Sequence, residues 1–230
     1  SDFLLSMVPG WKDSLFPAFH ALGGLQSAVA ITIVAIGLLR WAGGLKDYVG
    51  VEQTWGLSKL LLALSLLYAY FTWSGFLTFW YSKAPGEQAV LTLLLFGPYQ
   101  ALFYAAFGLN FVLPFLILLW NVARKSVLGP FLAGVSVLIG TFADRLRFYV
   151  AAFSVENIKA HELEHIPATR LPDGADILIM VGMVAGAVLL YMLATRLVSV
   201  VSIWELKELL HYRVVRPFMK TSVVVLAKPD

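Results

Sequence analysis

Three ionisable residues lie close together in a stretch of the chain that is otherwise apolar. Residues 131–153 are long enough to cross a bilayer as one helix, and their second half contains Asp144, Arg145 and Arg147. Charged groups at such depth are costly, so they usually face a protein interior or a wet cavity and pair with one another. Because successive helical residues turn by about 100°, we expect one of the two arginines to face away from Asp144, toward another helix or subunit.

Other groups with suitable chemistry fall at a similar depth. At a rise of about 1.5 Å per residue, His20 and Asp144 share one layer in the outer half of the membrane, and Tyr99, Gln100 and Tyr104 enter from the same side. The sequence therefore predicts one polar pocket that contains these five residues. Arg145 and Arg147 complete the candidate catalytic set of His20 and Asp144, and the other three are candidate ligand-binding residues.

Such a pocket could hydrogen-bond a quinol head group, with His20 or Asp144 accepting its protons. Two alternatives stay open from the residues alone. Asp144 and an arginine can form a structural ion pair, and His20 can be a hydrogen-bonding group between helices. Gln26 and Asn110 are expected to join helices rather than to bind a ligand.

Composition places the chain in a membrane. Of its 230 residues, 60% are hydrophobic and 13% charged, with a mean hydropathy of +0.80. The net charge of +3 reflects basic residues gathered in alternate loops, so topology explains it better than nucleic-acid binding does.

The absence of cysteine excludes cysteine-ligated iron–sulfur clusters, and His20 alone within the expected spans argues against haem. His161 and His165 recur at helical spacing but do not match a zinc motif, and we predict no metal site.

The elements that must position these residues are helices. We predict an all-α membrane protein with five transmembrane helices: a four-helix bundle within residues 1–153, an outer-side loop at 154–176, and an extra helix, a C-terminal amphipathic helix and a tail within 177–230. The expected spans are 13–40, 54–81, 98–121, 131–153 and 177–198. Residues 1–11 are expected to lie in the interface, residues 88–96 to form a half-helix, and residues 199–212 to form the amphipathic helix.

Loop charge predicts the orientation. Basic residues gather in the loop between the first two spans, in the loop between the third and fourth, and in the C-terminal tail, whereas the alternate loops carry fewer. By the positive-inside rule the N-terminus is outside and the C-terminus inside the cytoplasmic (inner) membrane. Lys59, near the inner end of its span, is expected to reach its own interface.

One segment carries a resemblance to a known family. Residues 57–87 end in an aromatic W-S-x-F-L-x-x-W-Y pattern before a proline turn. The positions that match are Ser58, Lys59, Trp73, Ser74, Phe76, Leu77, Trp80, Tyr81, Pro85 and Glu87. This pattern resembles that of the NrfD/PsrC-like family, the membrane subunits of polysulfide reductase-type complexes and of alternative complex III. Residues 2–19 are similar to the family's D-x-x-x-S-L-x-P-x-W opening, and Asp144 falls where the family carries an acidic residue.

The resemblance implies a membrane subunit of a quinone-linked respiratory oxidoreductase. Its substrate would be menaquinol or ubiquinol, or the corresponding quinone, and electrons would pass to an iron–sulfur, ferredoxin-like partner subunit or to haem in another chain. Other membrane subunits and lipid would complete the assembly, and no redox centre would belong to this chain. The chain resembles the second of the family's two stacked bundles, for which proton translocation and scaffolding remain alternatives. A non-catalytic anchor of the same kind of complex is the second hypothesis.

Overall fold

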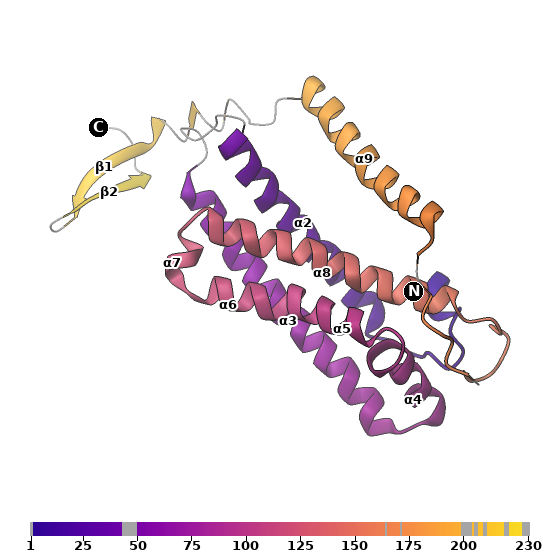
Figure 1. Cartoon of the computed structure of the whole chain (residues 1–230). Coiled ribbons are helices and arrows are strands. Elements are labelled where there is room, and N and C mark those ends of the chain that lie inside the picture. Colours follow the sequence, from indigo (N-terminus) through magenta and orange to yellow (C-terminus); the bar gives the residue numbers. More distant parts are fainter. Residues whose placement is uncertain are drawn as a thin grey trace. The chain divides into compact units, whose positions relative to one another are not determined.

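The computed structural model describes residues 2–42, 50–163, 165–170, 172–198, 204, 207–208, 211–218 and 221–226 (Figure 1). It divides into two compact units, Ser1–Arg170 and Leu171–Asp230. The first unit contains the candidate residues. The prediction of an all-α membrane protein is confirmed for the body of the chain, because helices dominate it and several are long and apolar enough to cross a bilayer.

Four long helical segments form the bundle of the first unit. α2 (Phe16–Ala42) packs against α3 (Val51–Ser82) and α8 (Leu128–Phe153), and a broken helix made of α5 (Gln100–Phe107), η2 (Gly108–Val112) and α6 (Leu113–Leu119) packs against α3 and α8. Short helices α1 (Asp2–Leu5), α4 (Pro85–Leu91), η1 (Thr92–Phe96) and α7 (Asn121–Arg124) join or cover them. The short helix expected at 88–96 is therefore present, as the end of α4 followed by η1.

Length and hydropathy select four helices among the described residues as able to span a membrane: Phe16–Trp41, Val51–Ser82, Gln100–Leu119 and Gly174–Leu197. α8 is long enough, with 26 residues, but its charged second half keeps it out of this set. Its buried face includes Gly134, Gly140, Asp144 and Arg147, and it contacts α2, α5, η2 and α6. The helix with the most polar sequence thus lies at the centre of the bundle, where protein rather than lipid surrounds its charges.

The third long segment departs from regular helix just before Pro114. Proline has no N–H and its ring crowds the preceding turn, so a wider π-helical turn at Gly108–Val112 accommodates it. The departure from regular helix before Pro114 is therefore spread over η2. This turn leaves the Asn110 carbonyl free to accept a hydrogen bond from another helix, and Asn110 is itself buried.

Close approach of α8 to η2 depends on Gly140. A Cβ atom added there would lie 2.8 Å from Leu109 Cβ and 2.9 Å from the Asn110 nitrogen, inside normal contact distance. We expect Gly140→Ala to destabilise the bundle by about 1–3 kcal/mol, because the two backbones must move apart. Thermal unfolding in detergent checks this. The matched control is Gly56→Ala in α3, where nothing lies within 4 Å of the added atom and helix propensity favours alanine. Equal melting temperatures of the Gly140→Ala and Gly56→Ala variants would contradict the close packing of α8 against η2.

The N-terminal segment packs against the bundle through several buried side chains, and its expected position in the membrane interface stays a prediction. Leu4, Val8 and Trp11 are buried, and the Trp11 ring stacks on Phe148 of α8 at a centroid distance of 6.0 Å and meets Phe16 edge-on at 5.0 Å. Large aromatic side chains gain stability from burial and from stacked or edge-on ring contacts of this kind. The segment therefore belongs to the core at the end of the bundle where α8 finishes.

The second unit contains α9 (Gly174–Leu197) and a hairpin. α9 begins with a capping box in which Asp173 and Asp176 each accept the other's backbone N–H. Strands β1 (Arg213–Phe218) and β2 (Thr221–Leu226) pair antiparallel, with Arg213 opposite Leu226 and Phe218 opposite Thr221. These strands were not expected from the sequence. The amphipathic helix expected at 199–212 lies mostly outside the described residues.

Candidate functional site

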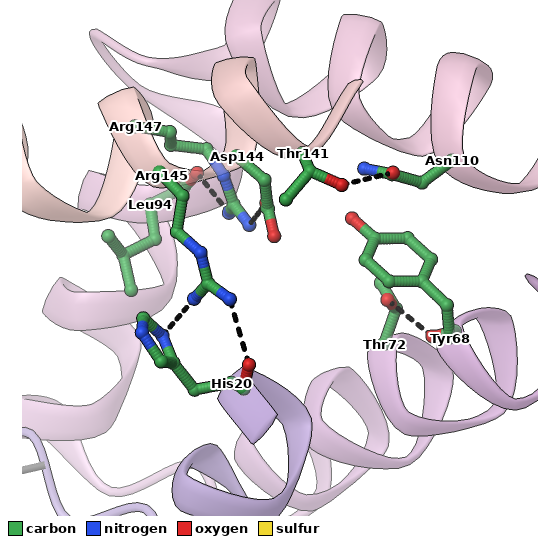
Figure 2. Close-up of polar contacts among 9 residues, drawn as sticks. All are labelled: His20, Tyr68, Thr72, Leu94, Asn110, Thr141, Asp144, Arg145 and Arg147. Atoms are coloured by element: carbon green, nitrogen blue, oxygen red, sulfur yellow. Dashed lines mark hydrogen bonds and ion pairs between the residues drawn. The ribbon is translucent and has the colours of Figure 1, made fainter. Parts of the chain in front are cut away.

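Asp144 and Arg147 form a buried ion pair on one face of α8. Arg147 Nη2 donates to Asp144 Oδ1 at 2.6 Å, and Nη1 donates to the Leu94 carbonyl of η1 at 3.0 Å (Figure 2). Arg147 is 3% exposed, and its guanidinium also lies over the Phe148 ring, 4.1 Å from the centroid. Residues three apart share a helix face, which is why this arginine and not its neighbour pairs with the carboxylate.

Arg145 leaves α8 in the direction of α2. Its Nη2 donates to the His20 carbonyl at 2.8 Å, and its Nη1 contacts His20 Nδ1 (Figure 2). Gly23 leaves room for this guanidinium, since a Cβ there would lie 3.0 Å from Nη2. The expectation that one arginine reaches a neighbouring helix is confirmed. An arginine N–H can only donate, so His20 Nδ1 is the acceptor and the ring offers Nε2 as its N–H donor.

The five residues expected in one polar pocket do not come together. His20 contacts Arg145 rather than Asp144. Gln100 Nε2 donates to the Tyr104 hydroxyl at 3.1 Å, one helical turn away on a face of α5 where Tyr104 is 56% exposed. Tyr99 is buried before α5, and its hydroxyl accepts a hydrogen bond from the Arg170 backbone N–H at 3.4 Å. The depth comparison gave the level of each side chain but not the direction in which it points.

A layer of polar side chains crosses the bundle next to the ion pair. Gln26 Nε2 donates to Ser65 Oγ at 3.0 Å and to the Asn110 carbonyl at 2.9 Å, and Thr141 donates to Asn110 Oδ1 at 3.0 Å. The expectation that Gln26 and Asn110 join helices is thereby confirmed. The Tyr68 hydroxyl points toward the Thr141–Asn110 pair (Figure 2) and, like Gln26 Oε1 and Asn110 Nδ2, has no hydrogen-bond partner among the described residues.

An aromatic cavity opens beside Arg147, at the end of the bundle where α8 finishes. Its volume is about 70 Å³, enough for several waters or for part of a ring system. The described residues that line it are mainly aromatic or aliphatic, and the charged ones are Asp13 and Arg147. The lining consists of Trp11, Asp13, Leu15, Phe16, Phe19, Phe71, Thr72, Gly75, Phe76, Phe79, Leu91, Leu94, Leu95, Phe103, Arg147 and Phe148.

Two donors and one acceptor stand out in this lining. Trp11 Nε1–H and Arg147 Nε–H are buried, and neither has a hydrogen-bond partner among the described residues. Asp13 Oδ1 accepts hydrogen bonds from the backbone N–H groups of Leu15 at 2.9 Å and Phe16 at 3.1 Å. These two bonds cap the start of α2, and neither of them uses the other carboxylate oxygen. The first long helix accordingly begins at Phe16 and not at residue 13.

The Asp13 carboxyl is shifted toward its protonated form. Burial raises the pKa of Asp13 above its ordinary value of 3.8, and the backbone N–H groups of Leu15 and Phe16, together with the nearby Trp11 indole N–H, offset only part of the rise. A carboxyl group whose pKa is raised and which lies in an apolar cavity is a candidate for proton transfer.

Asp13 enters the sequence prediction only as the first residue of the span 13–40, and Trp11 only as the last residue of the interfacial segment 1–11. An aspartate shortly before a long apolar run is typical of a helix N-cap, and it could have placed the carboxylate at the end of the helix. No local pattern could have shown that the residues before α2 fold over the end of α8.

His161 and His165 are exposed in the loop that follows α8. Among the residues that the structure describes, no three histidine, cysteine, aspartate or glutamate side chains lie close enough to hold a metal ion.

The fold and the buried charges define the class of molecule as a multi-pass α-helical membrane protein. Comparison with protein-family models gave no match, and a search of curated proteins found no relative. The resemblance to the NrfD/PsrC-like family therefore stays a prediction.

Proposed function

We propose that the chain is the membrane subunit of a quinone-linked oxidoreductase and that the aromatic cavity receives the head group of a quinol or quinone. The observation that carries the proposal is the lining of this cavity. Two buried donors without partners, on Trp11 and Arg147, occur with the Asp13 carboxyl among aromatic rings. A flat apolar ring with two opposite oxygens needs such walls and such polar groups.

Each residue has a role in this proposal. The aromatic walls bind the ring and exclude water, and Arg147 and Trp11 orient an oxygen by donating to it. When a quinol is oxidised, Asp13 accepts its two protons one after the other and releases each to water before it takes the next. Asp144 acts through Arg147, which it holds in place. The two electrons leave for an iron–sulfur or haem partner subunit, because this chain has no cysteine with which to bind a cluster. Menaquinone and ubiquinone both fit this description.

The position of the cavity agrees with the membrane orientation predicted from loop charge. The cavity lies at the beginning of α2 and the end of α8, the side that loop charge assigns to the outside of the cytoplasmic membrane. We propose that α8 crosses the membrane as a fifth span, between α6 and α9, because the Asp144–Arg147 pair and the His20 contact of Arg145 satisfy its charges within the bundle.

A structural anchor without chemistry is the second candidate. The closed Asp144–Arg147 pair favours it, since an ion pair with both partners buried serves packing without any substrate. Proton movement through the layer of Gln26, Asn110 and Tyr68 is compatible with the first candidate, and the buried polar atoms without partners in that layer support it.

Filling the cavity separates the two candidates. Gly75 lies in its wall, and a Cβ there would meet nothing within 4 Å, so Gly75→Leu adds bulk to the cavity without a clash at that atom. We expect the KM for quinol to rise on the order of tenfold in the assembled complex, because the ring loses its space. Gly56→Leu, at an open position outside the cavity on the same helix, is the control. Unchanged turnover in a correctly assembled Gly75→Leu complex would favour the anchor.

A further inference from the structure

Two lysine ammonium groups lie near the ring of Trp55, close to the start of α3 at the opposite end of the bundle, and Arg124 precedes the second of these lysines in the chain. The ammonium of Lys59 lies 3.4 Å from the centroid of that ring, and the ammonium of Lys125, after α7, lies 5.7 Å from it. Trp55 Nε1–H and Arg124 Nε–H are buried, and neither has a hydrogen-bond partner among the described residues. α7, which ends at Arg124, packs against α3.

This cluster has an excess of positive charge. Among the residues that the structure describes, none of Lys59, Arg124 and Lys125 pairs with a carboxylate. Two ammonium groups that share one indole ring repel each other, and the repulsion is stronger at the edge of a low-dielectric membrane than in water. The indole face attracts both cations but does not neutralise them. An anion with several acceptor oxygens would satisfy the lysines together with the two buried N–H groups.

We propose that this cluster binds the phosphate of an anionic phospholipid. The apolar surface beside it supports a lipid over a free ion, because Leu60 of α3 and Leu116 and Leu119 of α6 are exposed and give acyl chains a surface to lie on. The Lys59 side chain lies over Trp55, which is one helical turn closer to the start of α3. The ammonium group is therefore nearer to the helix end, where the lipid head groups lie, than the Lys59 backbone is. Basic clusters between helices are known to hold such head groups. The proposal does not depend on quinol binding.

Lipid-dependent stability tests the site. The full chain is placed in nanodiscs of phosphatidylglycerol or of phosphatidylcholine, and its melting temperature and the lipids that it retains in native mass spectrometry are measured. We expect the wild type to be more stable in phosphatidylglycerol and to retain that lipid. Lys59→Gln and Lys125→Gln should each weaken retention about fivefold, and together more, because each lysine near an anionic surface contributes to binding.

Matched variants separate charge from folding. Lys83→Gln with Lys159→Gln removes two lysines that follow the far ends of α3 and α8, and retention should not change. Lys59→Arg keeps the charge and should keep the lipid, and Trp55→Phe keeps a ring but loses the N–H and should weaken retention. Equal retention by Lys59→Gln/Lys125→Gln and wild type would overturn the proposal. A gain in stability of the same size from soluble inorganic phosphate in phosphatidylcholine nanodiscs would also overturn it, in favour of a free-anion site.

Discussion

Asp144→Asn is expected to destabilise the bundle by about 3–5 kcal/mol, the cost of removing one partner from a buried ion pair. Arg147 is 3% exposed, so without the carboxylate its guanidinium is buried with the Leu94 carbonyl and an aromatic ring beside it. The measurement is the thermal unfolding of the solubilised chain, followed by tryptophan fluorescence, with an expected fall in melting temperature on the order of 10 °C.

A paired substitution gives the control. Asp144→Leu with Arg147→Met removes both charges and should recover much of the lost stability, because well-packed apolar residues can replace a buried pair. Asp176→Asn, at the exposed start of α9, should change little. A melting temperature that does not move with Asp144→Asn would show that the pair does not form. Quinol turnover in a stable double variant would show that neither charge is needed for chemistry.

Asp13→Asn is expected to lower quinol turnover about 10²- to 10⁴-fold, the usual contribution of a general base. Asparagine caps a helix as well as aspartate does, so the bonds to Leu15 and Phe16 and the stability of α2 should be kept while the proton acceptor is lost. The fall should appear in kcat rather than in KM, since the aromatic walls still bind the ring. Full turnover in this variant would remove Asp13 from the mechanism.

The raised pKa of Asp13 gives this prediction a pH dependence. The carboxylate form accepts the proton, so the acid limb of the kcat/KM profile should lie above pH 3.8, and Asp13→Asn should abolish the limb. The contribution of Asp13 to the stability of the fold changes with pH in the direction opposite to kcat/KM. Between 3.8 and the raised pKa the folded chain holds this proton more tightly than the unfolded chain does, so the Asp13 contribution to stability falls as pH rises through that window. A melting curve of Asp13→Asn should lack this slope.

Sequence patterns were sufficient for the helices of the bundle but not for the site. Long apolar stretches and breaks at glycine and proline fix where helices run, because the bilayer sets their length. The 100° turn between residues correctly separated Arg145 from Arg147. Depth alone, however, could not show which helix face turns inward, and so Tyr104 was grouped with Asp144 although it lies on an exposed face.

Trp11 and Asp13 were not predicted as cavity residues, and one physical reason explains both. Trp11 and Asp13 reach the cavity because an irregular segment folds back over the end of the bundle, and no periodic pattern encodes such a turn. Gly10 permits it with a φ of 80°, and a Cβ there would lie 3.4 Å from the Cα of Gly86 in α4. That contact joins segments far apart in the chain, which only the folded arrangement reveals.

The two arginines of α8 have different consequences for how the protein enters the membrane during synthesis. The partner of Arg147 is three residues away on the same helix, so these charges can neutralise each other inside the translocon before any other helix is met. Arg145 finds its acceptors on His20, which the ribosome makes 125 residues earlier. If α8 crosses the membrane as proposed, we expect it to insert beside the first long helix, so that the charge of Arg145 sets an order for the assembly of the bundle.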